Sequence, residues 1–305
     1  MTPQPLLIPQ PLKNGDKIAI VSPAGIARAE DVYAAACVLE HQGWEVVVMP
    51  HALGRNGSYS GQFEERLDDL TKAFTDKEVR AIVCSRGGYG AVHLLEHLSN
   101  LPLRDDPKWL IGFSDITALH AMMLHHGIAS IHGPMTKYIR AHEGENTDFK
   151  ALCHILQGER IQYHFNTHPL NQIGKAEGTL MGGNLAVMGG LIGTPYDMLR
   201  PGSVLLIEDI GEPIYKVERW LWQMRLSGVL EHLNGLLVGS FTNYQPDSNY
   251  HTIEEMIATM TAEYQYPVVY GVPVGHGGRS LPMIEGGQVK INVHATKGAD
   301  VEFLI

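Results

Sequence analysis

The sequence predicts an α/β protein of two domains: an N-terminal doubly wound parallel sheet of the flavodoxin or Rossmann kind, and a C-terminal strand-rich mixed β/α domain. In the first half of the 305 residues, short apolar, β-branched runs alternate with helical segments. This is the rhythm of right-handed β-α-β crossovers. In the second half, strand-like runs outnumber helices. Hydrophobic residues make up 44% of the chain, which is enough for two cores.

The N-terminal elements follow from the apolar runs and their spacing. The strand at 17–22, KIAIVS, is stopped by Pro23 and Gly25, as a buried parallel strand is. Apolar side chains at helical spacing, such as Leu67, Leu70 and Phe74, indicate the inward faces of helices. The other expected strands are 45–49, 81–84 and 109–113, and the expected helices are 31–41, 64–74, 91–98 and 114–125.

A polar stretch separates the two halves. We expect domains at 1–140 and 170–305, joined by a linker at 141–169 that contains one helix, 147–156. Beyond the linker, the expected strands are 178–181, 203–207, 235–239, 268–272, 288–292 and 301–305, and the expected helices are 185–192, 214–226 and 252–263.

Charge and cysteine content exclude several classes of function. The net charge is −10 and no basic block is present, so we expect neither nucleic acid nor a membrane as partner. No uncharged apolar run approaches the roughly 20 residues of a membrane span, and the N-terminus lacks the order of a signal peptide, so we expect a cytoplasmic protein. Three distant cysteines and scattered histidines match neither a disulfide framework nor a metal motif.

Ser114 stands at a predicted strand-to-helix turn, in the context LIGFSDITALH. A serine there projects its hydroxyl from the carboxyl edge of a parallel sheet, where such sheets place ligands. The N–H of Asp115 then opens the helix, where developing negative charge is favoured. Ser114 is therefore a candidate nucleophile, although Ile116 replaces the second glycine of the G-x-S-x-G pattern. The alternative is a helix N-cap, because Ser-x-x-Thr before an apolar run is ordinary capping.

A glycine-rich turn, RGGYG at 86–90, follows the predicted strand 81–84. Glycines there let the backbone approach a ligand closely and present N–H groups to an anion. The pattern is neither G-x-G-x-x-G nor a Walker loop, so it gives little support to a dinucleotide cofactor. The alternative is a tight turn without a ligand. Because this turn and Ser114 both end strands of one parallel sheet, we expect them at the same edge.

A serine nucleophile needs a base and an acid that orients the base. Glu208 closes an apolar run, where a carboxylate is costly without a partner, and is a candidate acid. His276 lies in the glycine-flanked turn VPVGHGG and is a candidate base. The alternatives are a solvated strand end for Glu208 and a loop histidine without a role for His276. The local pattern does not select His276 among the 16 histidines.

Eight short motifs occur together in this chain: RGGYG (86–90), GFSD (112–115), GTLMGGN (178–184), GTP (193–195), LLIEDIGEP (205–213), VERWL (217–221), GSF (239–241) and GH (275–276). In this order and spacing, the set resembles the LD-carboxypeptidase family of serine peptidases, which includes muramoyltetrapeptide carboxypeptidases and microcin C self-immunity proteins. The resemblance runs from about residue 13 to the C-terminus. One departure is Ile284-Glu285, which stands where a glycine is expected.

The resemblance implies a catalytic triad of Ser114, Glu208 and His276. It also implies an oxyanion hole made of the backbone N–H groups of Gly88 and Asp115, in agreement with the two turns described above. The nucleophile then comes from the first domain and the acid and base from the second, so the site is expected between the domains.

Further contacts with the substrate are also expected. A carboxypeptidase needs a cationic or N–H-rich group for the terminal carboxylate, and Arg86 is a candidate because it borders the glycine turn. The alternative for Arg86 is an ion pair with a structural carboxylate. Three other residues are candidates to line the cleft: Asn184, Glu212 and Tyr215.

The reaction implied by the resemblance is hydrolysis of an amide between an L- and a D-stereocentre, usually the release of terminal D-alanine from murein tetrapeptide in peptidoglycan recycling. It needs no metal or organic cofactor, and the resemblance implies a homodimer. Two alternatives stay open. The same machinery could cleave microcin-type peptidyl or acyl-sulfamoyl nucleotides, or the chain could be a non-catalytic two-domain protein that binds a small molecule.

Overall fold

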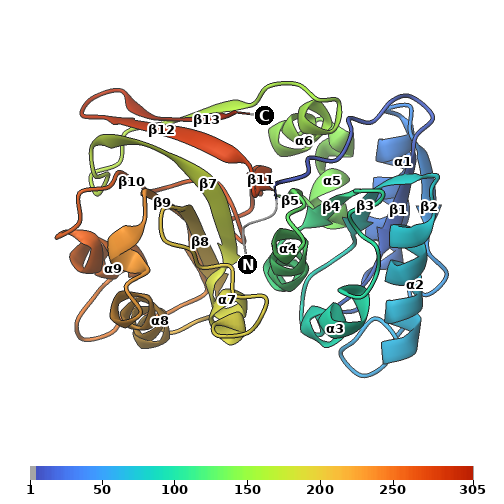
Figure 1. The fold of residues 1–305 in the computed structure, drawn as a ribbon, viewed down its shortest axis with the longest axis horizontal. Helices are drawn as coiled ribbons and strands as arrows, with labels where there is room; N and C mark the ends of the chain where they lie inside the picture. Colours follow the sequence, from blue (N-terminus) through green and yellow to red (C-terminus); the bar gives the residue numbers. More distant parts are fainter. Residues whose placement is uncertain (1–4, 305) are drawn as a thin grey trace. The chain divides into compact units, whose positions relative to one another are not determined.

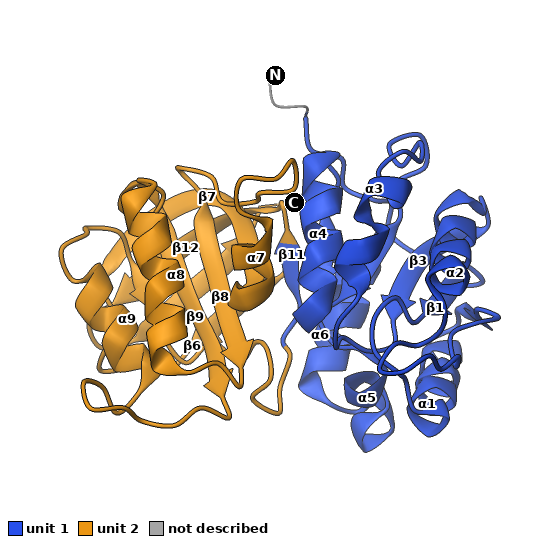
Figure 2. Ribbon diagram, turned by 90° about the horizontal axis from the view of Figure 1, so that it is seen from below, with its two compact units in different colours: residues 1–159, 281–284 blue, residues 160–280, 285–305 orange. Residues whose placement is uncertain are grey.

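The computed structural model describes residues 5–304 and separates into two compact units (Figure 1, Figure 2). Unit 1 takes residues 1–159 and 281–284, and unit 2 takes residues 160–280 and 285–305. The segment expected as a linker, 141–169, is therefore divided between the two units. Among the described residues, no helix is both long and apolar enough to cross a membrane.

The sheet of unit 1 has six strands in the order β11-β5-β4-β3-β1-β2, and β1 to β5 run parallel. The order 2-1-3-4-5 is that of a flavodoxin-like doubly wound sheet, so the predicted fold class is confirmed. The strands are β1 (Lys17–Val21), β2 (Glu45–Val48), β3 (Val79–Cys84), β4 (Trp109–Gly112), β5 (Ser130–His132) and β11 (Met283–Glu285).

Helices cover both faces of this sheet: α1, α5 and α6 lie on one face, and α2, α3 and α4 on the other (Figure 2). They are α1 (Ala29–Glu40), α2 (Phe63–Thr75), η1 (Ala91–Leu94) with α3 (Leu95–Leu98), η2 (Ser114–Ile116) with α4 (Thr117–His125), α5 (Thr136–Ile139), η3 (Ala141–Gly144) and α6 (Thr147–Leu156).

The strand order of unit 1 reverses between β1 and β3, and this switch point positions the turns that follow the strands. Open α/β sheets bind ligands outside the carboxyl ends of their strands at such a point. The turn after β1 contains Gly25, and the turn after β3 is the RGGYG segment, 86–90. The Gly25 N–H donates to the Gly87 carbonyl at 2.9 Å, so the two turns are fastened together at the switch point.

The sheet of unit 2 has seven strands in the order β10-β9-β8-β7-β12-β13-β6. Strands β7 to β10 are parallel, and β12 pairs antiparallel with β7 and β13. Helices α7, α8 and α9 pack on the parallel half (Figure 2). The elements are β6 (Gln162–Phe165), β7 (Gly174–Asn184), α7 (Leu185–Leu191), β8 (Val204–Ile210), α8 (Ile214–Leu226), η4 (Leu230–His232), β9 (Gly235–Thr242), α9 (Ile253–Thr261), β10 (Val268–Val269), β12 (Gln288–His294) and β13 (Gly298–Phe303).

The predicted and observed elements differ mainly where a strand is short. Helices 147–156 and 214–226 match α6 and α8 residue for residue, whereas β5, β6 and β11 are absent from the prediction. Each of these three strands has only three or four residues and lacks a long β-branched run. The strand predicted at 268–272 ends at Val269, because Gly271 has φ +71° and leaves the extended conformation. Ile305, at the end of the last predicted strand, lies outside the described residues.

Candidate active site

Ser114 follows the end of β4 in a strained backbone conformation. Its φ is +66°, in the left-handed region that residues other than glycine rarely adopt. The N-cap of the short helix η2 is Phe113 and not Ser114, so the capping alternative is not supported. Strain of this kind at the end of a parallel strand is a feature of nucleophile turns, where the hydroxyl must leave the plane of the sheet.

The glycine turn after β3 packs directly on Ser114. A Cβ on Gly87 would lie 2.7 Å from the Ser114 Cβ and 2.9 Å from its Oγ, so only glycine fits. Gly88, next in the chain, has φ +117° and its α-carbon lies close to Gly25. The structure therefore brings the two turns singled out in the sequence together within unit 1.

The Asp115 side chain links the same two turns. Its carboxylate accepts the Ala91 N–H at 2.8 Å. Burial raises the pKa of Asp115 above its ordinary value, and the hydrogen bond from the Ala91 N–H and the charges of His93 and Arg66 oppose that rise. Asp115 thus fixes the distal end of the glycine turn through its side chain, in addition to any role of its backbone N–H.

His120 of α4 supports the same region but is not suited to be a base. Its Nε2 lies 2.9 Å from the Gly112 carbonyl, and its Nδ1 lies 2.8 Å from the Ser130 hydroxyl. Complete burial lowers its pKa to about 4, so the ring is neutral at physiological pH. With both ring nitrogens engaged, His120 joins β4 to β5 beneath the Ser114 turn.

Unit 2 brings Glu208 and His276 together. Glu208 lies in β8 and is fully buried, and its Oε2 is 2.7 Å from the Nδ1 of His276. The other oxygen, Oε1, has no hydrogen-bond partner among the residues that the structure describes. A fully buried carboxylate with a single histidine partner is expensive to bury, which favours a functional over a merely structural role. The alternative of a solvated strand end for Glu208 is therefore wrong.

The backbone around His276 is built to admit this contact. Gly275 forms a parallel bridge with Ser240 of β9, and the Ser240 N–H donates to the Val274 carbonyl at 2.9 Å. Gly275 has φ +96°, and a Cβ at this position would overlap the Glu208 Oε2. Glycine is thus required both by the backbone conformation and by the approach of the carboxylate.

Replacing Gly275 by alanine is expected to separate Glu208 from His276. The added methyl group would occupy the space of Oε2, so we expect kcat to fall by at least about 10-fold in a hydrolysis assay. Gly278→Ala is the matched control. Gly278 also has positive φ, +86°, but no heavy atom lies near its Cβ position, so it carries only the conformational cost of about 1 kcal/mol. Equal activity of the two variants would contradict the assignment.

Asp209 orders the residues beside Glu208. Its carboxylate accepts the Asn184 side-chain N–H at 2.9 Å, the Ala186 N–H at 2.8 Å and the Ile210 N–H at 2.8 Å. Burial raises the pKa of Asp209 to about 6, and the neighbouring charge of Glu208 adds to that rise. Asn184 stands opposite Glu208 in the β7–β8 register, and its Oδ1 caps α7 by accepting the Val187 N–H.

The remaining predicted contact residues have partners of their own. Arg86 is exposed and donates to the Ile26 carbonyl at 3.1 Å, and it takes part in none of the ion pairs of the described residues. Glu212 pairs with Lys216 at 3.2 Å. Tyr215 is exposed, with Arg219 above its ring. The pairing of Arg86 with a structural carboxylate is therefore not observed, and substrate contacts by these residues stay predictions.

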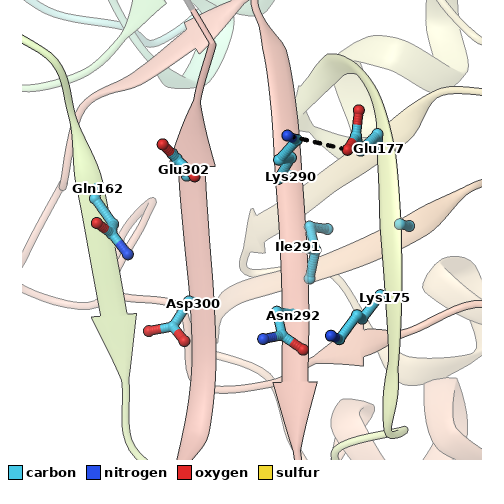
Figure 3. A pocket seen from close by; sticks show the side chains of 9 residues that line it. Gln162, Lys175, Glu177, Lys290, Ile291, Asn292, Asp300 and Glu302 are labelled. Atoms are coloured by element: carbon cyan, nitrogen blue, oxygen red, sulfur yellow. Dashed lines mark ion pairs between the residues drawn. The ribbon is translucent and has the colours of Figure 1, made fainter.

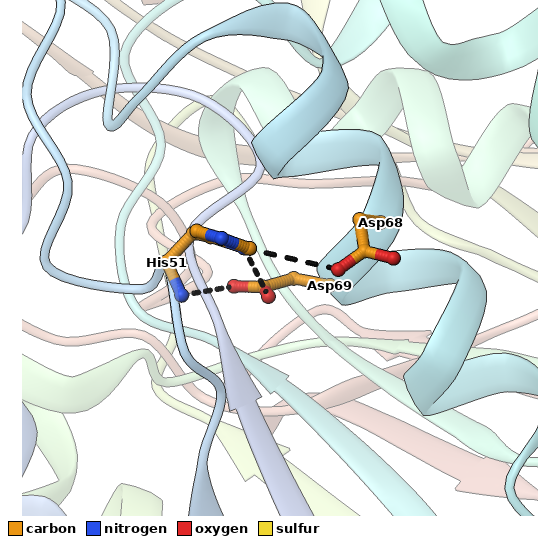
Figure 4. A group of neighbouring side chains, drawn as sticks. All are labelled: His51, Asp68 and Asp69. Atoms are coloured by element: carbon orange, nitrogen blue, oxygen red, sulfur yellow. Dashed lines mark hydrogen bonds and ion pairs between the residues drawn. The ribbon is translucent and has the colours of Figure 1, made fainter.

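Two other polar features lie elsewhere in their units. His51 donates its N–H to Asp69 at 3.0 Å, and its Nδ1 lies 2.9 Å from the other oxygen of that carboxylate, with Asp68 near by (Figure 4). Asp68 is also paired with Lys72 at 2.6 Å, so both carboxylates already have partners. A hollow on the open sheet face of unit 2 is lined by side chains of β6, β7, β12 and β13 and does not include Glu208 or His276 (Figure 3).

Glu285, at the position where the sequence departs from the family that it resembles, is a fully buried acid. Its Oε2 accepts the Gly182 N–H at 2.9 Å, and its Oε1 has no partner among the described residues. Burial raises the pKa of Glu285 to about 8, so the group is mostly protonated at neutral pH. It thus supports the glycine pair of β7, two residues before Asn184, without a buried charge.

Replacing Glu285 by glutamine is expected to change how stability depends on pH. In the folded protein the acid stays protonated up to about pH 8, whereas in the unfolded chain it ionises near 4.5. The folded state therefore loses up to about 1.4 kcal/mol of stability per pH unit as the pH rises between these values. Glu285→Gln removes this pH dependence. In chemical unfolding, the free energy of unfolding of the variant should therefore increase relative to that of the wild type from pH 5 to pH 8. An unchanged slope would contradict the prediction, and Glu302→Gln, on a partly exposed side chain, is the control.

Comparison with known proteins identifies the family. Residues 18–133 match the LD-carboxypeptidase N-terminal domain, and residues 177–291 match the LD-carboxypeptidase C-terminal domain. The murein tetrapeptide carboxypeptidase of Pseudomonas aeruginosa is 31% identical, over 87% of this chain and 89% of that protein. This chain belongs to the LD-carboxypeptidase family. It is therefore an enzyme of the carboxypeptidase class, and the resemblance stated from the motifs is confirmed.

Two solved structures share the fold of this chain. The muramoyltetrapeptide carboxypeptidase of Oxalobacter formigenes superimposes with a TM-score of 0.83 at 28% identity, covering 94% of this chain and 98% of that one. The protein MccF in complex with glutamyl sulfamoyl guanosine gives a TM-score of 0.82 at 21% identity, covering 99% of both chains. The second likeness concerns the fold alone.

Two polar residues that fix the backbone of the candidate site, Arg66 and Asp209, are not among the residues predicted from the sequence. Arg66 in α2 is buried and contacts two of the turns, and Asp209 fastens Asn184 and the start of α7. Asp209 lies in the quoted motif LLIEDIGEP, so its position beside Glu208 was a usable signal. Arg66 lies in an amphipathic helix among other charged residues, and nothing in its spacing distinguishes it from them.

Proposed function

We propose that this chain is a serine LD-carboxypeptidase that releases C-terminal D-alanine from murein tetrapeptide, with Ser114 as nucleophile, His276 as base and Glu208 as orienting acid. The observation that carries the proposal is the contact between the Glu208 Oε2 and the His276 Nδ1 at 2.7 Å. An isolated buried carboxylate on a histidine is the acid–base half of such a triad. The strained turn of Ser114 supplies the features of the nucleophile half.

The proposed proton transfers follow from this pairing. An ionised carboxylate can only accept hydrogen bonds, so the His276 Nδ1–H donates to Glu208, and Nε2 is left as the proton acceptor. His276 takes the Ser114 proton as the hydroxyl oxygen attacks the amide carbon, and then gives that proton to the leaving D-alanine nitrogen. Water hydrolyses the acyl-enzyme in the same manner and restores the Ser114 hydroxyl.

The backbone N–H groups of Gly88 and Asp115 are proposed to stabilise the tetrahedral intermediate. In support, Gly88 directly follows Gly87, which packs on Ser114, and Asp115 is the second residue of the short helix η2, which begins at Ser114. One oxyanion donor is typically worth about 3 kcal/mol of barrier. The glycine turn therefore needs a fixed position relative to Ser114.

Arg86 is proposed to bind the terminal carboxylate of the peptide. Its guanidinium is exposed, is engaged by one backbone carbonyl and belongs to the glycine turn itself. A guanidinium has five N–H donors in a planar fork that matches a carboxylate, so a single carbonyl leaves capacity for a substrate. Asn184, Glu212 and Tyr215 complete the proposed set of cleft residues.

A second candidate function is cleavage of a microcin-type peptidyl or acyl-sulfamoyl nucleotide. The observation that favours it is Tyr89, an aromatic side chain that is 57% exposed and directly follows Gly88. Its ring packs on those of Tyr59 and His93, with centroid distances of 6.2 and 5.2 Å. Such a ring beside the nucleophile turn could stack on a nucleobase.

The two functions are separated by one assay with the purified chain and mass-spectrometric detection. The substrates are murein tetrapeptide, the same peptide ending in L-alanine, and a glutamyl sulfamoyl nucleoside. We expect loss of D-alanine from the first peptide and no cleavage of its L-alanine counterpart. Cleavage of the nucleoside alone would favour the second function, and cleavage of none of the three substrates would contradict both. The homodimer, the cytoplasmic location and the place in peptidoglycan recycling stay predictions.

A further inference from the structure

We infer that Arg66 is a positioning residue of the proposed reaction: it fixes the glycine turn 86–90, and with it the Gly88 N–H, by joining that turn to the turn after β1. Arg66 lies in the first half of α2, far along the chain from Ser114. It does not touch the reacting atoms. Its effect on the reaction passes through the backbone that it holds.

One nitrogen of the guanidinium makes both connections. The Arg66 Nη1 donates to the Pro23 carbonyl at 2.7 Å and to the Gly90 carbonyl at 3.0 Å. Pro23 belongs to the turn after β1, and Gly90 ends the glycine turn after β3. The two N–H bonds of a single nitrogen thus span the switch point of the sheet. An ammonium on a lysine could reach either carbonyl but lacks the planar fork that holds both in fixed directions.

The opposite side of the same backbone is held by Asp115. Its carboxylate accepts the Ala91 N–H at 2.8 Å, while Arg66 donates to the Gly90 carbonyl at 3.0 Å. The Gly90 carbonyl and the Ala91 N–H, which are neighbours at the end of the turn, therefore each have a charged partner on another element. Charge-assisted bonds of this kind are stronger than neutral ones, so the turn is held more firmly than a loop of this composition would be by itself.

The environment of Arg66 is costly for a cation. The side chain is buried, 4% exposed, and it forms none of the ion pairs of the described residues. Its Nε has no hydrogen-bond partner among those residues. Two neighbours stabilise the buried positive charge: the Tyr59 ring, whose centroid lies 5.1 Å from the guanidinium carbon, and the negative charge of Asp115. Burial accordingly lowers the Arg66 pKa below its ordinary value. A cation buried chiefly to hold two loop carbonyls indicates that their position matters.

This inference rests on the proposed function, in which the Gly88 N–H stabilises the transition state. An oxyanion donor is used mainly in the transition state, so its displacement lowers kcat and leaves KM nearly unchanged. A shift of about 1 Å in such a group costs on the order of 100-fold in rate. The expected loss for Arg66→Met is therefore about 10- to 100-fold in kcat, with KM within about 3-fold of the wild type.

The test compares Arg66→Met and Arg66→Lys with Arg80→Met. Arg80 is the matched control because it lies at the other end of β3 and its guanidinium pairs with Asp106 at 2.7 Å. Steady-state kinetics on murein tetrapeptide are measured together with hydrogen exchange of the peptide spanning residues 86–94. We expect Arg66→Met to lower kcat and to speed exchange at residues 90 and 91 by at least about 10-fold. Arg66→Lys should have values of kcat and of the exchange rate between those of Arg66→Met and the wild type. Arg80→Met should change neither kcat nor the exchange rate.

The outcomes separate this inference from the proposed function. If Arg66→Met keeps the wild-type kcat and exchange rates, the inference is wrong and the proposed function stands. If the wild type cleaves no tetrapeptide, the exchange comparison still decides whether Arg66 fixes the turn. Two further results would overturn the inference about Arg66: a change for Arg66→Met in KM alone, or an equal loss of activity in Arg80→Met. Should Arg66→Met fail to fold, Arg66→Lys decides by the same two measurements.

Discussion

Ser114→Ala is expected to lower kcat for tetrapeptide hydrolysis by at least about 10,000-fold, because the acyl-enzyme cannot form without the hydroxyl. The residual rate would come from the oxyanion donors and from binding alone. The fold should be preserved. Alanine at φ +66° has about the same backbone strain as serine, and the Cβ that packs on Gly87 remains in place. The thermal unfolding midpoint should therefore change little.

The matched control for this prediction is Ser99→Ala. Ser99 follows α3 in the same unit, and its hydroxyl is bonded to the His126 ring at 2.7 Å, so the variant also loses one hydrogen bond. We expect wild-type kcat for it. Brief incubation with substrate, acid quenching and intact-mass measurement add an independent check, since an acyl adduct should form on the wild type and not on Ser114→Ala. Activity of Ser114→Ala within 10-fold of the wild type would remove Ser114 from the mechanism.

Glu208→Gln should have the second-largest effect, a fall of about 1,000- to 10,000-fold in kcat. The glutamine fills the same volume, but its amide can donate to the His276 Nδ1. The ring proton then moves to Nε2, which is the nitrogen that must accept the Ser114 proton. The variant also loses the negative charge that stabilises the imidazolium. The direct measurement is kcat from pH 6 to pH 9. Raising the pH does not restore the correct tautomer of His276, so the loss in kcat should persist over this whole range.

Glu285→Gln is the control for the Glu208 experiment. Both side chains are fully buried carboxyl groups of unit 2, and both are replaced by the same amide. Only Glu208 contacts His276. We expect near wild-type kcat for Glu285→Gln at pH 7. A comparable loss in both variants would mean that the effect of Glu208→Gln reflects general damage to unit 2 and not the triad.

The sequence predicted the parallel sheet because its strands are local, apolar and separated by helices, so each could be recognised from neighbouring residues alone. The Glu208–His276 contact joins residues from β8 and from the loop after β10. No local pattern contains that pairing, and the family motifs were needed to choose His276. Within unit 1, the closeness of Ser114 to the glycine turn followed from strand order, which the alternation of strands and helices already restricts.

The prediction for α2 shows where local patterns mislead. The periodicity placed Leu67 on the buried face with Leu70, yet Leu67 is only half-buried whereas Arg66 and Asp69 are buried. Hydrophobic spacing assigns polar side chains to the solvent. It cannot register a polar group that is buried because another segment offers it carbonyls or N–H groups. Those partners come from turns separated from Arg66 by more than twenty residues.

The strand β11 has a bearing on how this enzyme can be dissected. Met283 and Ile284 belong to unit 1 and pair as its sixth strand beside β5, although they follow almost all of unit 2 in the chain. A gene fragment that stops at residue 159 would make β5 an edge strand with unpaired backbone N–H and C=O groups. Such an edge can pair with the same edge of another copy and cause self-association. Studies of the unit that carries Ser114 alone therefore require residues 281–284 to be grafted onto it, by circular permutation or as a supplied peptide.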